Sequence, residues 1–304
     1  MGKIVAAVAT SHAFALVEPK QWDIGRKRNL DSYKNKYGPT APTYNGEFES
    51  LEDAEKRYSE IQRAHDQFRD LLIKRRVTAA LIIGDDQDEN LSEDNLPQLA
   101  VFVGDRFMVG QREFKSNREI NLSLLTGLVK EGFEPAHLGK LEDGVLLSHA
   151  HGPVLSRLLA DIDIPVTVVF LNAIHIPAME PWRCYQLGKA IQKILDRVSE
   201  DNFAIIGSGG LSHFTAGYPW KQYSGPFTYG SISTEFDHRF LEALKQHRVR
   251  EFTRSIDRED LLYHGELETR SWLAIAGMVG KRRPELVAYE PFYRGLMGMG
   301  VAIW

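Results

Sequence analysis

The sequence has a single cysteine, Cys184, among its 304 residues. One cysteine cannot form a disulfide within the chain, and it also excludes a metal cluster held by several thiolates. Free cysteines are usually buried, so we expect Cys184 to be a small core residue near the start of a helix.

A long hydrophobic run and a strong excess of either charge are also missing. No apolar stretch approaches the roughly 18–20 residues that cross a bilayer, so we expect no membrane segment. The formal net charge of −4 and the pI near 6.2 provide no basic surface for nucleic acid or acidic membranes. The first residues enter a strand-like run without the features of a secretory signal. We therefore expect a cytoplasmic protein.

Internal repeats, low-complexity tracts and linkers are absent as well, and short β-branched runs alternate with helical patterns. This alternation predicts the α/β class: a single large domain, 1–304, with a central mixed or parallel sheet flanked by helices. Two long polar segments, 18–50 and 215–230, are expected to be loops, the first with short helical pieces. Strands are expected at 4–8, 79–83, 99–103, 107–109, near 133, at 165–171, 203–206 and within 286–304. Helices are expected at 51–75, 117–130, 149–159, 181–196, 234–246 and 265–278. The runs 99–103 and 107–109 are expected to pair with each other.

Four of the apolar runs end in polar residues that can do chemistry. The ends of these runs carry Ser11 and His12, Asp85 to Gln87, Asn172 and His175, and Ser212 and His213. In open α/β sheets, ligands collect at the carboxyl ends of the strands. Several histidines and carboxylates at one edge of a sheet indicate a metal or acid–base site.

Two common alternatives find little support in the motifs. The glycine-rich segment 207–210 lacks the Lys-Ser/Thr of a phosphate-binding loop and the full dinucleotide spacing, so nucleotide binding is disfavoured. Neither Ser11 nor Ser208 lies in a Gly-x-Ser-x-Gly turn, which disfavours a serine hydrolase.

Individual polar residues leave more than one interpretation open. Glu268 precedes Trp272 by four residues and Ile275 by seven, so it shares their apolar helix face. A carboxylate there needs a metal or a distant Arg or Lys as its partner. His149 and His151 are two residues apart, so they would diverge on a helix and would not easily share a metal. Either could donate a proton at a helix start. An acidic group surrounds Gln87 and could cap the following loop or face a site; its members are Asp85, Asp86, Asp88 and Glu89.

With these residues in view, the chain resembles the class III extradiol ring-cleavage dioxygenases, of the type of the protocatechuate 4,5-dioxygenase beta chain. The similarity extends over nearly the whole length. It rests on Thr-Ser-His at 10–12, Ile-Gly-Asp-Asp-Gln at 83–87, His-Gly at 151–152, Pro-Val-Thr-Val-Val at 165–169 with Asn172, Arg-Cys-Tyr-Gln-Leu-Gly at 183–188, Gly-Ser-Gly-Gly-Leu-Ser-His at 207–213 and Glu-Thr-Arg-Ser-Trp at 268–272.

The resemblance implies a mononuclear non-haem Fe(II) held by two histidines and one glutamate. The matching positions are His12, Gln87 and Glu268, so the chain has glutamine where the family has a histidine. A neutral amide oxygen is a poorer Fe(II) ligand than imidazole. Gln87 could ligate weakly, Asp86, Asp88 or Glu89 could replace it, or the site could have lost its iron. We favour a metal site with an altered ligand set.

The resemblance also implies roles for the remaining polar residues. His213 matches the base that takes a phenolic proton, and His151 matches an acid that acts during ring opening. His175 and Ser212 are expected to contact the substrate. The aromatic residues of the two long loops could close over a planar ring or pack on themselves.

Three functions remain in competition. The first is an Fe(II)-dependent extradiol-type dioxygenase that opens the ring of a catechol, an aminophenol or a related dihydroxy aromatic with O2. The second is a divergent relative with an altered metal site and other chemistry, such as hydrolysis. The third is a non-catalytic subunit paired with an active homologous chain. A homo-oligomer and a hetero-oligomer with a small alpha-type subunit are both compatible with the sequence.

Overall fold

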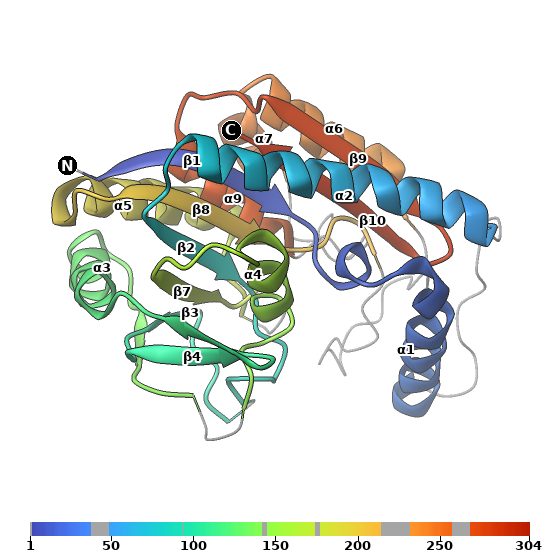
Figure 1. The fold of residues 1–304 in the computed structure, drawn as a ribbon, viewed down its shortest axis with the longest axis horizontal. Coiled ribbons are helices and arrows are strands. Elements are labelled where there is room, and N and C mark those ends of the chain that lie inside the picture. The colour runs from blue at the N-terminus through green and yellow to red at the C-terminus, as the bar shows by residue number, and fades with distance from the viewer. Residues whose placement is uncertain are drawn as a thin grey trace.

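A computed structural model of the protein describes residues 2–37, 49–92, 94–141, 145–173, 177–213, 232–256 and 268–304, and its centre is an eight-stranded sheet (Figure 1). The strands of this sheet are β1 (Lys3–Thr10), β2 (Ala79–Gly84), β3 (Leu99–Phe102), β6 (Ala136–Leu138), β7 (Val166–Leu171), β8 (Asn202–Ser208), β9 (Leu286–Phe292) and β10 (Met297–Ile303). Their order across the sheet is β6-β3-β7-β2-β8-β1-β10-β9.

The four central strands run parallel. β8 lies between β1 and β2, with Ile205 opposite both Ala7 and Leu81, and β7 lies on the other side of β2. Antiparallel pairs flank this group, β3 beside β7 at one side and β10 beside β1 at the other. The sheet is therefore mixed, which confirms the predicted fold class. The carboxyl ends of β1, β2, β7 and β8 meet at one edge.

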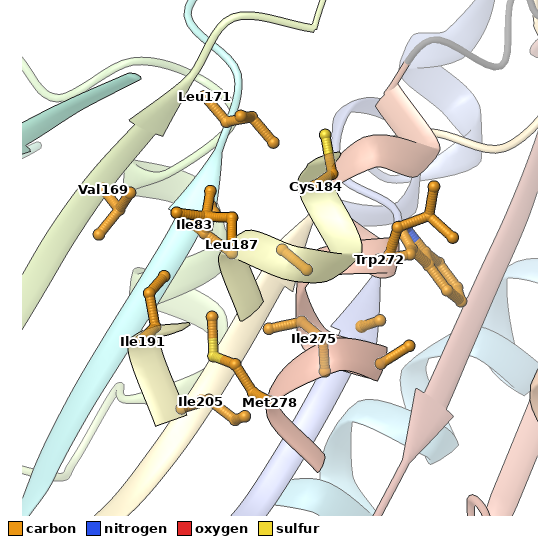
Figure 2. Packing of buried hydrophobic residues seen from close by; sticks show 14 of the residues in the cluster. Ile83, Val169, Leu171, Cys184, Leu187, Ile191, Ile205, Trp272, Ile275 and Met278 are labelled. Atoms are coloured by element: carbon orange, nitrogen blue, oxygen red, sulfur yellow. The ribbon is translucent and has the colours of Figure 1, made fainter. Parts of the chain in front are cut away.

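Helices cover both faces of the sheet because the central strands are apolar on both sides. One face packs residues such as Ile83, Val169 and Ile205 against α3 (Arg118–Lys130), α5 (Pro181–Val198) and α9 (Thr269–Val279). Figure 2 shows these strand residues beside Leu187 of α5 and Ile275 of α9. The other face packs alternate strand residues against α2 (Leu51–Lys74) and α4 (Gly152–Leu158).

The remaining elements are α1 (Trp22–Tyr37), α6 (Thr234–Lys245), α7 (Val249–Ser255), the short 3-10 helices η1 (Ala13–Leu16) and η2 (Pro19–Gln21), and a separate hairpin of β4 (Arg106–Val109) and β5 (Arg112–Lys115). Cys184 is buried in the first turn of α5, as expected. Among the helices described, none has the length and hydrophobicity needed to cross a membrane.

The expected pairing of 99–103 with 107–109 is wrong. β3 is buried along its whole length and takes β7 and β6 as its two neighbours. β4 alternates exposed and buried residues, and it pairs with β5 instead. A strand that is buried on both faces is typical of a sheet interior, whereas a strand with alternating burial suits a hairpin on the surface.

The first long polar segment is also more regular than expected. Residues 22–37 form α1, a helix of 16 residues, where only short helical pieces were predicted. Trp22 at its start is fully buried and stacks on Phe292, with ring centroids 4.4 Å apart. This stacking holds the start of the helix against β9. Residues 38–48 and 214–231 lie outside the described residues.

Candidate metal centre and adjoining cavity

Three segments that are far apart in the sequence meet at the carboxyl edge of the sheet. His12 follows β1, Asp85 follows β2, and Glu268 lies directly before α9. Each offers one ligand atom, and these atoms all lie within 4.8 Å of one another. All three side chains are at most 3% exposed. Two buried carboxylates this close together need a cation or a proton to compensate their charge, because each alone is costly to remove from water.

The glycine-rich turn after β8 makes room for Glu268. A Cβ atom on Gly209 would lie 2.2 Å from the Glu268 carbonyl oxygen, and one on Gly210 would lie 2.8 Å from Glu268 Oε2. The Gly210 N–H donates to that same Oε2, and the Trp272 indole N–H donates to the Gly209 carbonyl at 2.9 Å. The two glycines thus allow the start of α9 to approach the sheet edge closely enough to deliver its carboxylate.

His12 is oriented as a metal ligand would be. Its Nδ1 lies 3.1 Å from the Ser208 hydroxyl, and its Nε2 faces Glu268 Oε2 at 3.5 Å. Burial lowers the pKa of His12 to about 3, although Glu268 opposes this shift. The imidazole is therefore neutral, and a hydrogen bond from one ring nitrogen leaves the other available for a metal.

His213 faces the other carboxylate oxygen of Glu268. Its Nδ1 is 2.6 Å from the Leu211 carbonyl, which can only accept, so this nitrogen carries a proton. Its Nε2 lies 3.3 Å from Glu268 Oε1. Burial alone would lower the pKa of His213, but the Glu268 carboxylate raises it. Burial likewise opposes ionisation of Glu268, yet His213 and His12 hold the pKa of that carboxyl well below its usual range.

Gln87 presents its amide nitrogen to the cluster. This nitrogen donates to Asp85 Oδ2 at 2.9 Å and to Glu268 Oε1 at 3.1 Å. The other oxygen of Asp85, Oδ1, is buried and has no hydrogen-bond partner among the described residues. Burial and the neighbouring Glu268 raise the pKa of Asp85 to about 8.

The other carboxylates of this turn are engaged elsewhere. Asp86 accepts the backbone N–H groups of Glu89, Asn90 and Leu91 at 2.9–3.2 Å, so it caps the loop, as one interpretation of the acidic group proposed. Glu89 accepts a hydrogen bond from His149 Nδ1 at 2.7 Å. Asp88 is exposed.

His149 connects the cluster to a cavity of about 750 Å³. Its ring is perpendicular to that of His12, with centroids 4.9 Å apart. Burial alone would lower the pKa of His149, but its hydrogen bond with Glu89 raises it to about 9. The cavity has the size of typical small-molecule sites. Its walls include Leu16, Tyr58, Gln62, Glu89, Val109, Leu146, Leu147, His149, Pro153 and Arg157.

Two other predicted site residues, His151 and Ser212, make their hydrogen bonds with residues outside the cluster. His151 is fully buried with both ring nitrogens engaged, Nδ1 with the Ser148 hydroxyl at 2.7 Å and Nε2 with the Val169 carbonyl at 3.0 Å. The Ser212 hydroxyl donates to Asp237 at 2.6 Å and accepts from the Ser233 N–H at 2.8 Å. His175 lies outside the described residues. The roles of these three residues stay predictions.

Two residues at the cluster were not singled out as site residues from the sequence. Asp85 directly follows the last residue of β2 and was grouped with the acidic residues around Gln87 rather than with the ligands. A signal for it exists, because it shares a strand end with Gln87. His149 was considered only as an alternative to His151, and no pattern in the segment 149–151 distinguishes the two.

The donor set fits a divalent metal. One neutral imidazole and two carboxylates supply the nitrogen and oxygen ligands that iron and manganese use. The partnerless Asp85 Oδ1 is the atom that a cation would satisfy. Fold and cluster together define an α/β protein with a candidate metal centre at the carboxyl ends of its parallel strands.

Comparison with known proteins agrees with this description. The profile of the family described as the catalytic LigB subunit of aromatic ring-opening dioxygenase matches residues 106–303. This span is more than half of the chain, which therefore belongs to that family, and the resemblance drawn from the sequence is confirmed. The matched span includes His151, His213 and Glu268, whereas His12 and Asp85 precede it.

One solved structure shares the fold over nearly its whole length. The crystal structure of the uncharacterized protein JW3007 from Escherichia coli K12 aligns over 98% of this chain and 99% of that chain, with a TM-score of 0.52 and 12% identity. At this identity the likeness shows the fold alone. A search of curated proteins gave no match.

Proposed function

We propose that this protein is an Fe(II)-dependent extradiol-type dioxygenase that opens the ring of a catechol, an aminophenol or a related dihydroxy aromatic with O2. The observation that carries the proposal is the convergence of His12, Asp85 and Glu268, whose ligand atoms lie within 4.8 Å of one another. The chain that holds this cluster belongs to a family of aromatic ring-opening dioxygenases. Bound there, Fe(II) supplies open coordination positions and the redox chemistry that ring opening by O2 requires.

The base in this proposal is His213. Its Nδ1–H is fixed by the Leu211 carbonyl, so in the neutral form of the ring the lone pair is on Nε2. That nitrogen faces the cluster, where it can accept the proton of a phenolic hydroxyl. Glu268 then stabilises the imidazolium that forms, because its Oε1 is 3.3 Å away.

The cavity is the route by which we propose the ring reaches the centre. Its walls at Leu16, Val109 and Leu147 are apolar, and His149 lies where the cavity meets the cluster. Apolar walls with a few polar groups at one end suit a planar aromatic with polar substituents. The structure holds His151 in two hydrogen bonds, so any proton transfer by it requires one of them to break.

Metal content and oxygen uptake test the proposal together. Protein purified anaerobically and loaded with Fe(II) is expected to hold about one iron per chain and to consume O2 with catechol or 2-aminophenol. His12→Ala should lose the iron. His213→Ala should keep it while kcat falls about 10²- to 10⁴-fold, the usual contribution of a general base. His137→Ala, which alters an exposed histidine on β6, is the matched control and should change neither.

The rival functions give different results. Turnover of an aromatic or ring-opened substrate without O2 would favour the divergent enzyme. A wild type that takes up no iron even after loading would contradict the dioxygenase, and co-purification with a homologous chain would then favour the non-catalytic subunit.

A further inference from the structure

Glutamine occupies the position to which the family resemblance assigns a histidine ligand, and the structure shows what this glutamine does. The Gln87 amide nitrogen donates to one oxygen of Asp85 and one oxygen of Glu268. The reverse orientation would place the amide oxygen against two carboxylate oxygens, a repulsive arrangement when both carboxyls are ionised, as they are around a bound cation. The oxygen therefore faces away from the cluster, and Gln87 has no donor atom to offer a cation there.

Asp85 has the properties that Gln87 lacks. It is 2% exposed, and its Oδ1 is buried without a hydrogen-bond partner among the described residues. One of its oxygens lies within 4.8 Å of ligand atoms on both His12 and Glu268. A buried carboxylate oxygen without a partner destabilises a fold unless something binds it.

The neighbouring carboxylates cannot take this place without giving up other contacts. Both oxygens of Asp86 hold the backbone of the following turn. Both oxygens of Glu89 bind His149, one through its ring and one through its backbone N–H.

We propose that Asp85 replaces the missing histidine as the third ligand, so that this chain holds a divalent metal with one histidine and two carboxylates, His12, Asp85 and Glu268. Gln87 is a positioning residue, whose amide holds the two carboxylates together. The inference rests on the metal site of the proposed function but not on its reaction. A set with two carboxylate oxygens favours ions such as Fe(II) and Mn(II) that accept oxygen ligands.

Metal titration of the full chain tests the inference without any turnover. Chelator-treated protein is titrated anaerobically with Fe(II) and separately with Mn(II), and the bound metal is counted after gel filtration. Wild type should bind about one ion per chain, and Asp85→Asn should bind it at least ten times more weakly. Asp88→Asn removes the same charge from an exposed position of the same turn, where φ is +61° and asparagine is well tolerated. It should bind within twofold of wild type.

Gln87→Ala tests whether Gln87 is a positioning residue or a ligand, even if Asp85→Asn does not fold. If Gln87 only positions the carboxylates, its loss should weaken binding by less than about tenfold and should alter the electron paramagnetic resonance spectrum of bound Mn(II). The Asp88→Asn spectrum should match wild type. A loss of more than 100-fold in Gln87→Ala, or wild-type affinity in a folded Asp85→Asn, would overturn the inference.

Failure of the inference can be told apart from failure of the proposed function. Normal metal binding by wild type with the expected loss in Asp85→Asn, but no oxygen uptake, would contradict the dioxygenase and leave the ligand set standing. Oxygen uptake by a folded Asp85→Asn that retains its iron would contradict the ligand set and leave the dioxygenase standing.

Discussion

The histidine at position 65 shows how one residue makes the edge of the site sensitive to acid. His65 lies on α2 against Thr10, the last residue of β1 and two residues before His12. The Thr10 hydroxyl donates to the Ser11 carbonyl at 3.0 Å, so His65 Nε2 must donate to that hydroxyl, 2.8 Å away. Its Nδ1 is buried with no partner among the described residues. A proton there would be buried and unpaired, and burial lowers the pKa of His65 to about 3.

This shift predicts a loss of stability in mild acid. Because the folded pKa of about 3 lies below the ordinary value of 6.5, the unfolded chain binds more protons between these values, and stability falls as the pH drops from 6.5 toward 3. From pH 7 to pH 5 the wild type should lose about 2 kcal/mol through this group. His65→Gln keeps a donor and cannot be protonated, so its urea midpoint should fall less over the same range. The control is His137→Gln, at an exposed histidine, which should follow the wild type. Equal pH slopes for His65→Gln and wild type would contradict the assignment.

Single residues also show how far the candidate site could be predicted from the sequence. His12, His213 and Glu268 were identified because each follows an apolar run or breaks an apolar helix face, and the structure brings them together. The placement of Asp85 depends on which way the turn after β2 directs its side chains, and that direction is set by the Asp86 cap. Burial of His151 against Val169 depends on contacts across the sheet, which local spacing does not report.

Among the elements, α5 and α9 cross with their backbones in close contact. A Cβ atom on Gly188 would lie 1.9 Å from the Ala274 carbonyl oxygen, and one on Gly277 would lie 2.1 Å from the Tyr185 carbonyl oxygen. Glycine at these positions lets the two backbones touch. Glu268 directly precedes α9, so this crossing also determines where the carboxylate reaches the sheet edge.

Gly188→Ala should therefore disturb both stability and metal binding. The added methyl meets backbone rather than a flexible side chain, so the helices must separate, at a cost of about 3 kcal/mol or more. Thermal unfolding and Fe(II) titration measure the two effects, and the affinity should fall with the stability. Gly139→Ala is the matched control, because a Cβ there meets nothing within 4 Å and the position is exposed. A Gly188→Ala protein as stable as this control would show that the helices can separate freely.

At the same scale, sequence patterns predicted the central elements better than the peripheral ones. β2, β7 and β8 are continuous apolar runs because both of their faces are covered, and such runs are visible in the sequence. The partner of β3 was mistaken because a short run does not reveal its neighbours, and a nearby turn at residues 104–105 suggested a hairpin. The length of α1 was missed because its polar sequence has little apolar periodicity, and burial of Trp22 supplies its anchor.

For the whole molecule, the candidate centre joins the amino-terminal strand, the second strand and a helix near the carboxyl end. At the edge where these segments meet, ligand oxygens of Asp85 and Glu268 lie buried within 4.8 Å of each other. Without a cation, burial and the neighbouring Glu268 raise the pKa of Asp85 to about 8. A bound divalent ion would neutralise both carboxylates and link the three segments. The folded chain, and not the unfolded one, presents the three ligands together, so metal binding must add to the stability of the fold.

Removal of the metal should consequently lower the unfolding temperature of the wild type. At a free Fe(II) or Mn(II) concentration 100 times the dissociation constant, the bound ion contributes about 2.7 kcal/mol, which corresponds to roughly 5 °C in a chain of this size. Anaerobic thermal scans with the metal and with excess chelator measure the difference. His12→Ala and Asp85→Asn should unfold at the same temperature under both conditions, whereas Asp88→Asn should shift as the wild type does. If the metal stabilises Asp85→Asn as much as the wild type, then the ion binds elsewhere, because an ion at this cluster cannot stabilise the fold equally with and without the Asp85 carboxylate.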